Sequence, residues 1–285
     1  MTLKMRYLLL FFIAFVTGSC SAQHLEHTTV QYKNSAGVSK NQQSLDIYPA
    51  QGVNRPVVVF VHGGAWLLGD KDNKIDSKVS LFRKENYVFV SINYRLSSIF
   101  SRNVQYPQHT EDVADAIKWI HDNIKNYGGD PNQIVLVGHS AGAQMVSLIG
   151  TDHSFLKKRK VPISDIKGII SADTEGYDVY GLGKEGVKIY RRIFGEDLEI
   201  WKKASPLYNV EPGNSYPPFL IFARGESYRH EMAQKFARKL LEAGADVQVE
   251  EADQYSHFEI NNRIGEEKEG IVTPKILSFL QNVFK

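Results

Sequence analysis

The chain contains almost no cysteine, with the single residue Cys20 among 285. One cysteine cannot form an intrachain disulfide, and its place near the N-terminus leaves no thiol in the body of the chain. This excludes both a disulfide framework and cysteine-nucleophile chemistry. The composition, 42% hydrophobic and 23% charged, is ordinary for a globular protein, and its length allows one large core.

An excess of charge of one sign is also missing. Lys and Arg number 34 against 32 Asp and Glu, and Lys4 and Arg6 near the N-terminus account for the difference. A neutral balance without a basic stripe argues against nucleic acid as a partner.

Long apolar runs are absent except at the N-terminus, where residues 7–16 follow Lys4 and Arg6. The run is too short for a transmembrane helix, which needs about 20 apolar residues. Small residues follow it, so residues 1–22 are predicted to be a signal peptide and residues 23–285 the exported, mature chain without a transmembrane segment.

Two processing routes remain open at Cys20. Cleavage after Ala22 would give a soluble periplasmic or secreted protein, whereas Gly18-Ser19-Cys20 resembles a bacterial lipoprotein signal. The second route would make Cys20 a lipid anchor at the cell envelope.

Short apolar runs alternate with helical patterns along the rest of the chain. This alternation predicts an α/β fold with a mostly parallel, doubly wound sheet covered by helices on both faces. The expected strands are residues 57–61, 87–92, 134–137, 166–171, 219–222 and 248–250, and the expected helices are 110–126, 231–243 and 273–284.

Residues 174–210 interrupt this alternation. The stretch has no strand pattern, is punctuated by glycine and contains a predicted helix at 185–194. An insertion of this length between core strands is usually functional, so we expect a small cap over the site.

Gly138-His139-Ser140-Ala141-Gly142 follows the apolar run 134–137 directly and precedes a predicted helix. In this strand–turn–helix context, a Gly-x-Ser-x-Gly string predicts a nucleophile elbow with Ser140 as the nucleophile. The flanking glycines would be needed because side chains there would collide with neighbouring backbone.

A second glycine-rich string, His62-Gly63-Gly64-Ala65-Trp66, lies directly after the strand at 57–61. Acyl transfer needs two N–H donors aimed at the developing oxyanion, and glycines let backbone amides approach it. We expect the oxyanion hole at Gly63, Gly64, Ala65 and Ala141, with the donors being the amides of Gly64 or Ala65 and of Ala141.

The expected general base is His257, the one histidine that follows the last predicted strand and precedes the last helix. His139 lies inside the elbow, but it neighbours Ser140 and would point away from the hydroxyl. We therefore expect a structural role for His139.

These motifs resemble those of the α/β-hydrolases, in particular the carboxylesterase and lipase branch with a His-Gly-Gly motif. That branch includes hormone-sensitive-lipase-like, feruloyl-esterase-like and arylformamidase-like enzymes. The resemblance extends from about Ser44 to the C-terminus, and it implies a serine hydrolase without metal or organic cofactor that acts on small-molecule esters. Besides the elbow and the His-Gly-Gly string, the resemblance rests on five further motifs. These are Asn93-Tyr94-Arg95-Leu96, Tyr106-Pro107, Glu111-Asp112-Val113, Tyr127-Gly128-Gly129-Asp130-Pro131 and Ser205-Pro206.

The sequence offers more than one candidate for the acid of the triad. Many relatives carry an aspartate in a Gly-x-x-Asp string after the seventh strand, where this chain has Gly225-Glu226-Ser227-Tyr228. The resemblance to arylformamidases favours Glu226 as the acid, with Asp253 or a Ser140–His257 dyad as alternatives. Trp66 and Tyr94 are expected to line the substrate pocket.

Together these observations predict an exported serine esterase that forms an acyl-enzyme on Ser140. Three alternatives remain: an arylformamidase or other amide hydrolase, an exported peptidase, and a non-catalytic binding protein on a hydrolase fold. The chain is too short for the extra domain by which such peptidases usually select peptides.

Overall fold

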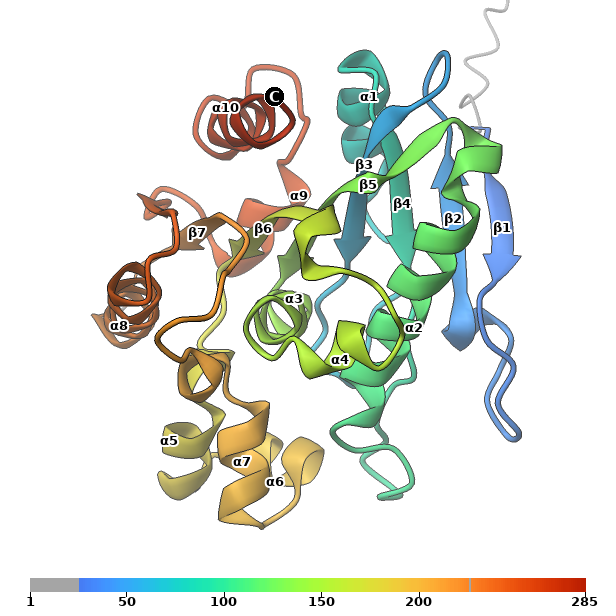
Figure 1. The fold of residues 1–285 in the computed structure, drawn as a ribbon. Helices are drawn as coiled ribbons and strands as arrows, with labels where there is room; N and C mark the ends of the chain where they lie inside the picture. Colours follow the sequence, from blue (N-terminus) through green and yellow to red (C-terminus); the bar gives the residue numbers. More distant parts are fainter. Residues whose placement is uncertain (1–25, 226) are drawn as a thin grey trace, which may run out of the picture.

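The computed structural model describes residues 26–225 and 227–285 and is built around one eight-stranded sheet (Figure 1). The strands lie in the order β1-β2-β4-β3-β5-β6-β7-β8, and β3 to β8 pair in parallel. This confirms the predicted α/β fold. The strands are β1 (Thr28–Gln31), β2 (Ser44–Tyr48), β3 (Arg55–Val61), β4 (Val88–Ile92), β5 (Gly129–His139), β6 (Ile166–Ala172), β7 (Phe219–Ala223) and β8 (Val247–Glu251).

The sequence did not indicate β1 and β2, which form an antiparallel extension at one edge. β1 has four mostly exposed residues and therefore shows no apolar run. β2 is fully buried but includes Ser44 and Asp46, so its polar residues conceal it in the sequence.

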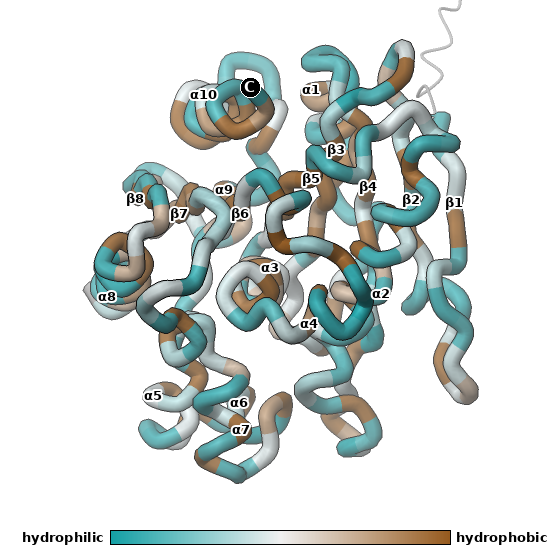
Figure 2. The backbone as a smooth tube through the Cα atoms, viewed as in Figure 1, coloured by the Kyte–Doolittle hydropathy of each residue, from teal (hydrophilic) through white to brown (hydrophobic). Residues whose placement is uncertain are grey.

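The central strands are buried on both faces because helices cover the sheet on either side. In β3, Val57, Val59 and Val61 contribute to one core, and Val58 and Phe60 contribute to the other. Figure 2 shows β3 and β5 as apolar along much of their length, whereas the covering helices carry apolar and polar residues in turn.

The first core contains residues of α2 (Gln108–Asn123), α3 (Ala141–Thr151) and α8 (Ser227–Glu242). The second contains residues of α1 (Asp76–Lys84), α9 (His257–Asn262) and α10 (Val272–Val283). A short helix, α4 (Ser154–Lys157), follows α3. All residues of α3 are buried, which fixes this helix firmly beneath the site.

The structure describes every residue between β6 and β7. There the chain forms short helices and no strand. They include α5 (Val179–Lys184), α6 (Lys188–Phe194) and α7 (Leu198–Ala204), which gather below the sheet in Figure 1. This segment, which we call the cap, corresponds to the insertion predicted at 174–210, and α6 lies within the helix predicted at 185–194.

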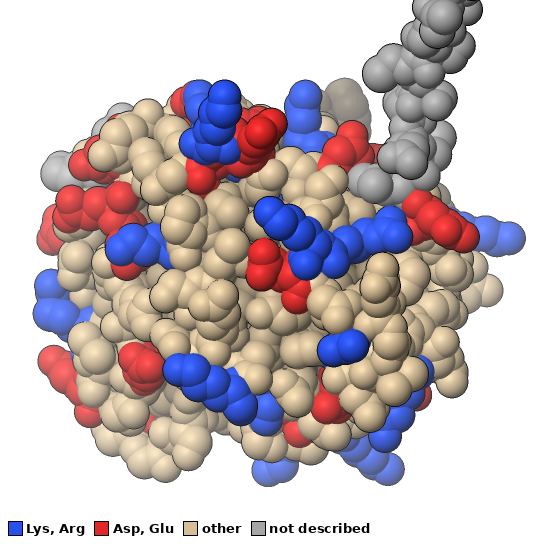
Figure 3. Space-filling view, turned by 90° about the horizontal axis from the view of Figure 1, so that it is seen from above, with Lys and Arg blue, Asp and Glu red and all other residues tan. Residues whose placement is uncertain are grey.

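The predicted signal peptide and Cys20 lie outside the described residues. Within the described part, no helix is long and apolar enough to cross a membrane. Basic and acidic side chains are interspersed on the face shown in Figure 3.

The contact between α3 and β3 leads to a prediction about stability. A Cβ on Gly142 would lie 2.1 Å from the carbonyl oxygen of Val61 and 2.7 Å from that of His62. Alanine is otherwise favoured over glycine in a helix by about 1 kcal/mol. We expect Gly142→Ala nevertheless to lower the free energy of unfolding by about 1–3 kcal/mol, because backbone atoms cannot move aside.

Urea denaturation measures this effect, with Gly270→Ala as the control. A Cβ on Gly270 meets nothing within 4 Å. The control should therefore stay within about 0.5 kcal/mol of the unaltered protein. Equal stability of the two variants would contradict this account of the packing.

Candidate active site

Ser140 lies at the sharp turn between β5 and α3, at the carboxyl edge of the parallel strands. Its backbone angles are φ 55° and ψ −116°, an unfavourable conformation for a residue with a side chain. Such strain is kept only where the surroundings fix it, and here the Ser140 amide donates to the carbonyl oxygen of Ala172 at 3.0 Å.

The two glycines of the elbow are required by close backbone contacts. A Cβ on Gly138 would lie 2.4 Å from the carbonyl group of Gly142, and a Cβ on Gly142 would overlap Val61. The steric reason predicted for both glycines is confirmed.

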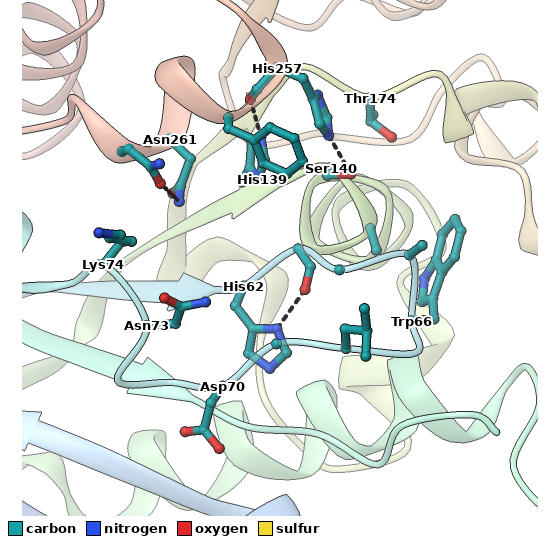
Figure 4. Close-up of a pocket in the computed structure, with 18 of the residues that line it drawn as sticks. His62, Trp66, Asp70, Asn73, Lys74, His139, Ser140, Thr174, His257 and Asn261 are labelled. Atoms are coloured by element: carbon teal, nitrogen blue, oxygen red, sulfur yellow. Dashed lines mark hydrogen bonds between the residues drawn. The ribbon is translucent and has the colours of Figure 1, made fainter.

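His257 is the first residue of α9, and the start of this helix is fixed by a capping box. The Ser256 hydroxyl accepts a hydrogen bond from the Glu259 amide, and the Glu259 carboxylate accepts one from the Ser256 amide. The ring of His257 reaches the elbow, where Nε2 accepts a hydrogen bond from Ser140 Oγ at 3.0 Å (Figure 4). The structure therefore brings together the two residues predicted as nucleophile and base.

The other ring nitrogen of His257 corrects the predicted acid. Nδ1 donates to Asp173 Oδ2 at 2.5 Å. Nδ1 carries a single hydrogen, which here is donated to Asp173. Asp173 therefore takes the role that was predicted for Glu226. Glu226 itself lies outside the described residues. The alternative Asp253 accepts a hydrogen bond from the Gly225 amide at 2.7 Å instead. The structure thus holds a complete Ser–His–Asp relay of Ser140, His257 and Asp173. The dyad alternative has no carboxylate at His257 and so does not describe this site.

Asp173 directly follows β6, and its side chain is 1% exposed. Its Oδ2 also accepts a hydrogen bond from Arg224 Nε at 2.7 Å, and Arg229 Nη1 lies 3.6 Å away. Burial alone would raise the pKa of Asp173, but the hydrogen bond from His257 and the charges of Arg229 and Arg224 outweigh it and lower this pKa. The carboxylate is therefore ionised at neutral pH and can hold the His257 ring.

The position of Asp173 in the sequence is itself a signal for this role, beyond those on which the prediction of Glu226 rested. Asp173 follows the apolar run 166–171 almost directly, at the same edge of the sheet as Ser140. It also falls between Ser140 and His257, the chain order of α/β-hydrolase triads.

The expected oxyanion loop follows β3 and lies beside the elbow. Gly64, Ala65 and Trp66 all have positive φ, at 112°, 51° and 59°. A Cβ on Gly64 would lie 2.1 Å from the carbonyl oxygen of Leu68, so this turn requires glycine. Ala141 is the first residue of α3, where a backbone amide has no partner within the helix. These positions fit the predicted oxyanion donors.

Trp66 and Tyr94 have different roles in the structure. Trp66 lines the cavity and makes edge-on contacts with Tyr190 and Phe194 of α6, at ring-centroid distances of 5.8 and 5.1 Å. Tyr94 does not line the cavity, contrary to the prediction. It is buried under the oxyanion loop, stacks on His62 and donates to the His62 carbonyl oxygen at 3.0 Å.

Ser140 and His257 open into a cavity of about 630 Å³, a size that suits a small organic ligand. Towards the cap its wall is formed by Trp66, Thr174, Glu175, Ile189, Tyr190 and Arg229. The lining also includes the polar residues Asp70, Asn73, Lys74, Asn261 and Asn262 and the exposed side chains of Leu68 and Phe258. In the described part of the chain, no group of three or more His, Cys, Asp or Glu side chains is arranged to hold a metal ion.

Curated relatives of the chain include several esterases. Esterase LipQ of Mycobacterium tuberculosis is 30% identical over 232 residues, which cover 73% of this chain and 52% of LipQ. A probable isoprenylcysteine α-carbonyl methylesterase of Arabidopsis thaliana, ICMEL2, is 31% identical over 67% of this chain and 47% of its own length. The chain thus spans about half the length of these relatives.

Solved structures share the fold at low sequence identity. Esterase B of Lactobacillus rhamnosis has a TM-score of 0.74 at 18% identity, covering 90% of this chain and 85% of that one. A truncated carbohydrate esterase from gut microbiota has the same TM-score and the same identity, and the match covers 92% of this chain and 98% of that one. The family model BD-FAE matches residues 45–239, the stretch that contains the oxyanion loop, Ser140 and Asp173. With this sheet, this elbow and this match, the chain belongs to the BD-FAE family of α/β-hydrolases.

Proposed function

We propose that the protein is a serine esterase that hydrolyses small-molecule carboxylic esters through an acyl-enzyme on Ser140. The observation that carries this proposal is the hydrogen-bonded relay from Ser140 Oγ through His257 to Asp173, in which Ser140 and His257 line the cavity. The esterase names of the relatives agree with it.

In the first half-reaction, His257 Nε2 takes the hydroxyl proton as Ser140 Oγ attacks the ester carbonyl carbon. The carbonyl oxygen becomes an oxyanion, which the amides of Ala141 and of Gly64 or Ala65 stabilise. Asp173 stabilises the charged His257 ring. The intermediate then breaks its bond to the alcohol oxygen, which takes the proton from His257 and leaves.

In the second half-reaction, His257 removes a proton from water, and the resulting hydroxide attacks the acyl group on Ser140. Collapse of the second intermediate returns the proton to Ser140 Oγ and releases the acid. The scheme uses only side chains and amides of the chain itself and involves no cofactor.

The non-catalytic alternative loses its motivation. It rested on the missing aspartate, and Asp173 supplies a carboxylate at His257 Nδ1.

We further propose that the protein is exported, on the basis of the basic residues and the short apolar run at its N-terminus. The periplasm, the medium and a lipid anchor at Cys20 all agree with this pattern.

The nucleophile is tested by Ser140→Ala with short-chain p-nitrophenyl esters as substrates. We expect the unaltered protein to hydrolyse them and the variant to lose this activity almost completely, because the proposed acyl-enzyme forms on the Ser140 hydroxyl. Circular dichroism serves as the control for folding. A folded Ser140→Ala protein that keeps most of its activity would refute the mechanism.

The acid is tested by Asp173→Asn. We expect kcat to fall by up to about 10⁴-fold, because an amide favours the wrong tautomer of His257. Asp253→Asn removes a carboxylate from the neighbouring loop and should leave kcat nearly unchanged. If Asp253→Asn were the damaging change and Asp173→Asn the silent one, the assignment of the acid would be wrong.

Export is tested by mass spectrometry of the protein isolated from its native host. Cleavage would leave an N-terminus at Gln23, and the lipoprotein route would leave an acylated Cys20. A protein that retains Met1 and the following apolar run would contradict the proposal.

A further inference from the structure

We propose that His139 is a positioning residue that holds the backbone of His257 at the right distance from Ser140. The inference rests on the proposed function of Ser140 and His257. Its basis is a hydrogen bond in which His139 Nε2 donates to the carbonyl oxygen of His257 at 2.8 Å (Figure 4). The two rings also pack together, with centroids 4.6 Å apart.

The protonation state of His139 suits this role. The residue is 5% exposed, and burial, assisted by the nearby charge of His257, lowers its pKa to about 3. His139 is therefore neutral at working pH. A carbonyl oxygen can only accept, so the single ring hydrogen must lie on Nε2.

The place of His139 in the chain makes this contact effective. His139 is the last residue of β5 and precedes Ser140 directly, while His257 is the first residue of α9. One hydrogen bond thus joins the strand that carries the nucleophile to the helix that carries the base. The contact spans 118 residues of sequence.

The other anchors of α9 act elsewhere. The capping box shapes the start of the helix internally. At its far end, the buried Lys78 Nζ donates to the carbonyl oxygen of Asn261 at 2.7 Å. Asp173 sets the orientation of the His257 ring through Nδ1. The hydrogen bond from His139 holds the His257 backbone itself, and hence the reach of Nε2 to Ser140 Oγ.

The test compares His139→Met with His139→Gln. The two side chains are similar in size, but only glutamine has an N–H donor. We expect His139→Met to lower kcat by about 10²-fold, the effect of a misplacement of about 1 Å, with little change in KM. His139→Gln should recover most of the loss. The rate at which a fluorophosphonate labels Ser140 should follow the same order, since it reports the same activation by His257.

His153→Met is the matched control. His153 is a half-buried histidine whose pKa is likewise lowered by burial, but it follows the far end of α3. Its loss should leave kcat unchanged. Rates are expressed per folded molecule, with the folded fraction taken from circular dichroism, so that lost stability is not mistaken for lost positioning.

The outcomes separate the two proposals. Equal kcat in His139→Met and the unaltered protein, or equal losses in the Met and Gln variants, would overturn the role of the hydrogen bond. Ser140→Ala is assayed in parallel: if it is inactive while His139→Met is normal, only the inference about His139 fails. If Ser140→Ala is active, the proposed function itself fails.

Discussion

The hydrogen bond from His257 Nδ1 to the buried carboxylate of Asp173 is the contact that makes one site out of separate loops. A buried carboxylate is stable only when it is paired, and Arg224 and Arg229 supply charges in addition to the bond from His257. The sheet order explains how these groups meet. β5, β6, β7 and β8 lie side by side in parallel, so the residues that follow them reach the same edge: Ser140, Asp173, Arg224 and the loop to His257.

The site is strained and is held by its surroundings. Ala65, Trp66, Ser140 and Asp173 all have positive φ without being glycine, and such conformations cost on the order of 1–3 kcal/mol each. At Ser140 the strain persists because α3 and β3 pack too closely for the backbone to relax. The α3 helix is buried along its whole length and approaches β3 through Gly142, which keeps the nucleophile and the oxyanion loop at a fixed separation. We interpret this rigidity as the preorganisation that acyl transfer requires.

The cap is connected to both parts of this machinery. Trp66, at the end of the oxyanion loop, packs on Tyr190 and Phe194 of α6. Arg229, beside Asp173, also pairs with Glu175 at the start of the insertion at 2.9 Å. Changes in the cap that alter the cavity wall therefore also act on the acid and the oxyanion loop. In the proposed esterase, substrate selection and catalysis would share these contacts.

The sequence by itself determined the α/β fold, the elbow with Ser140, the glycine-rich loop after β3 and the place of His257. Each of these depends on a few adjacent residues at the end of an apolar strand, so local patterns are enough. It did not determine the acid, because several carboxylates, including Asp173, Glu226 and Asp253, come shortly after predicted strands in the sequence. Only the path of the loops decides which of them reaches His257. The same holds for Tyr94, whose ring turns under the loop and away from the cavity, and for His139, whose partner lies 118 residues away. Contacts between distant segments follow from the twist of the sheet and the packing of its loops, and these exist only in the folded chain.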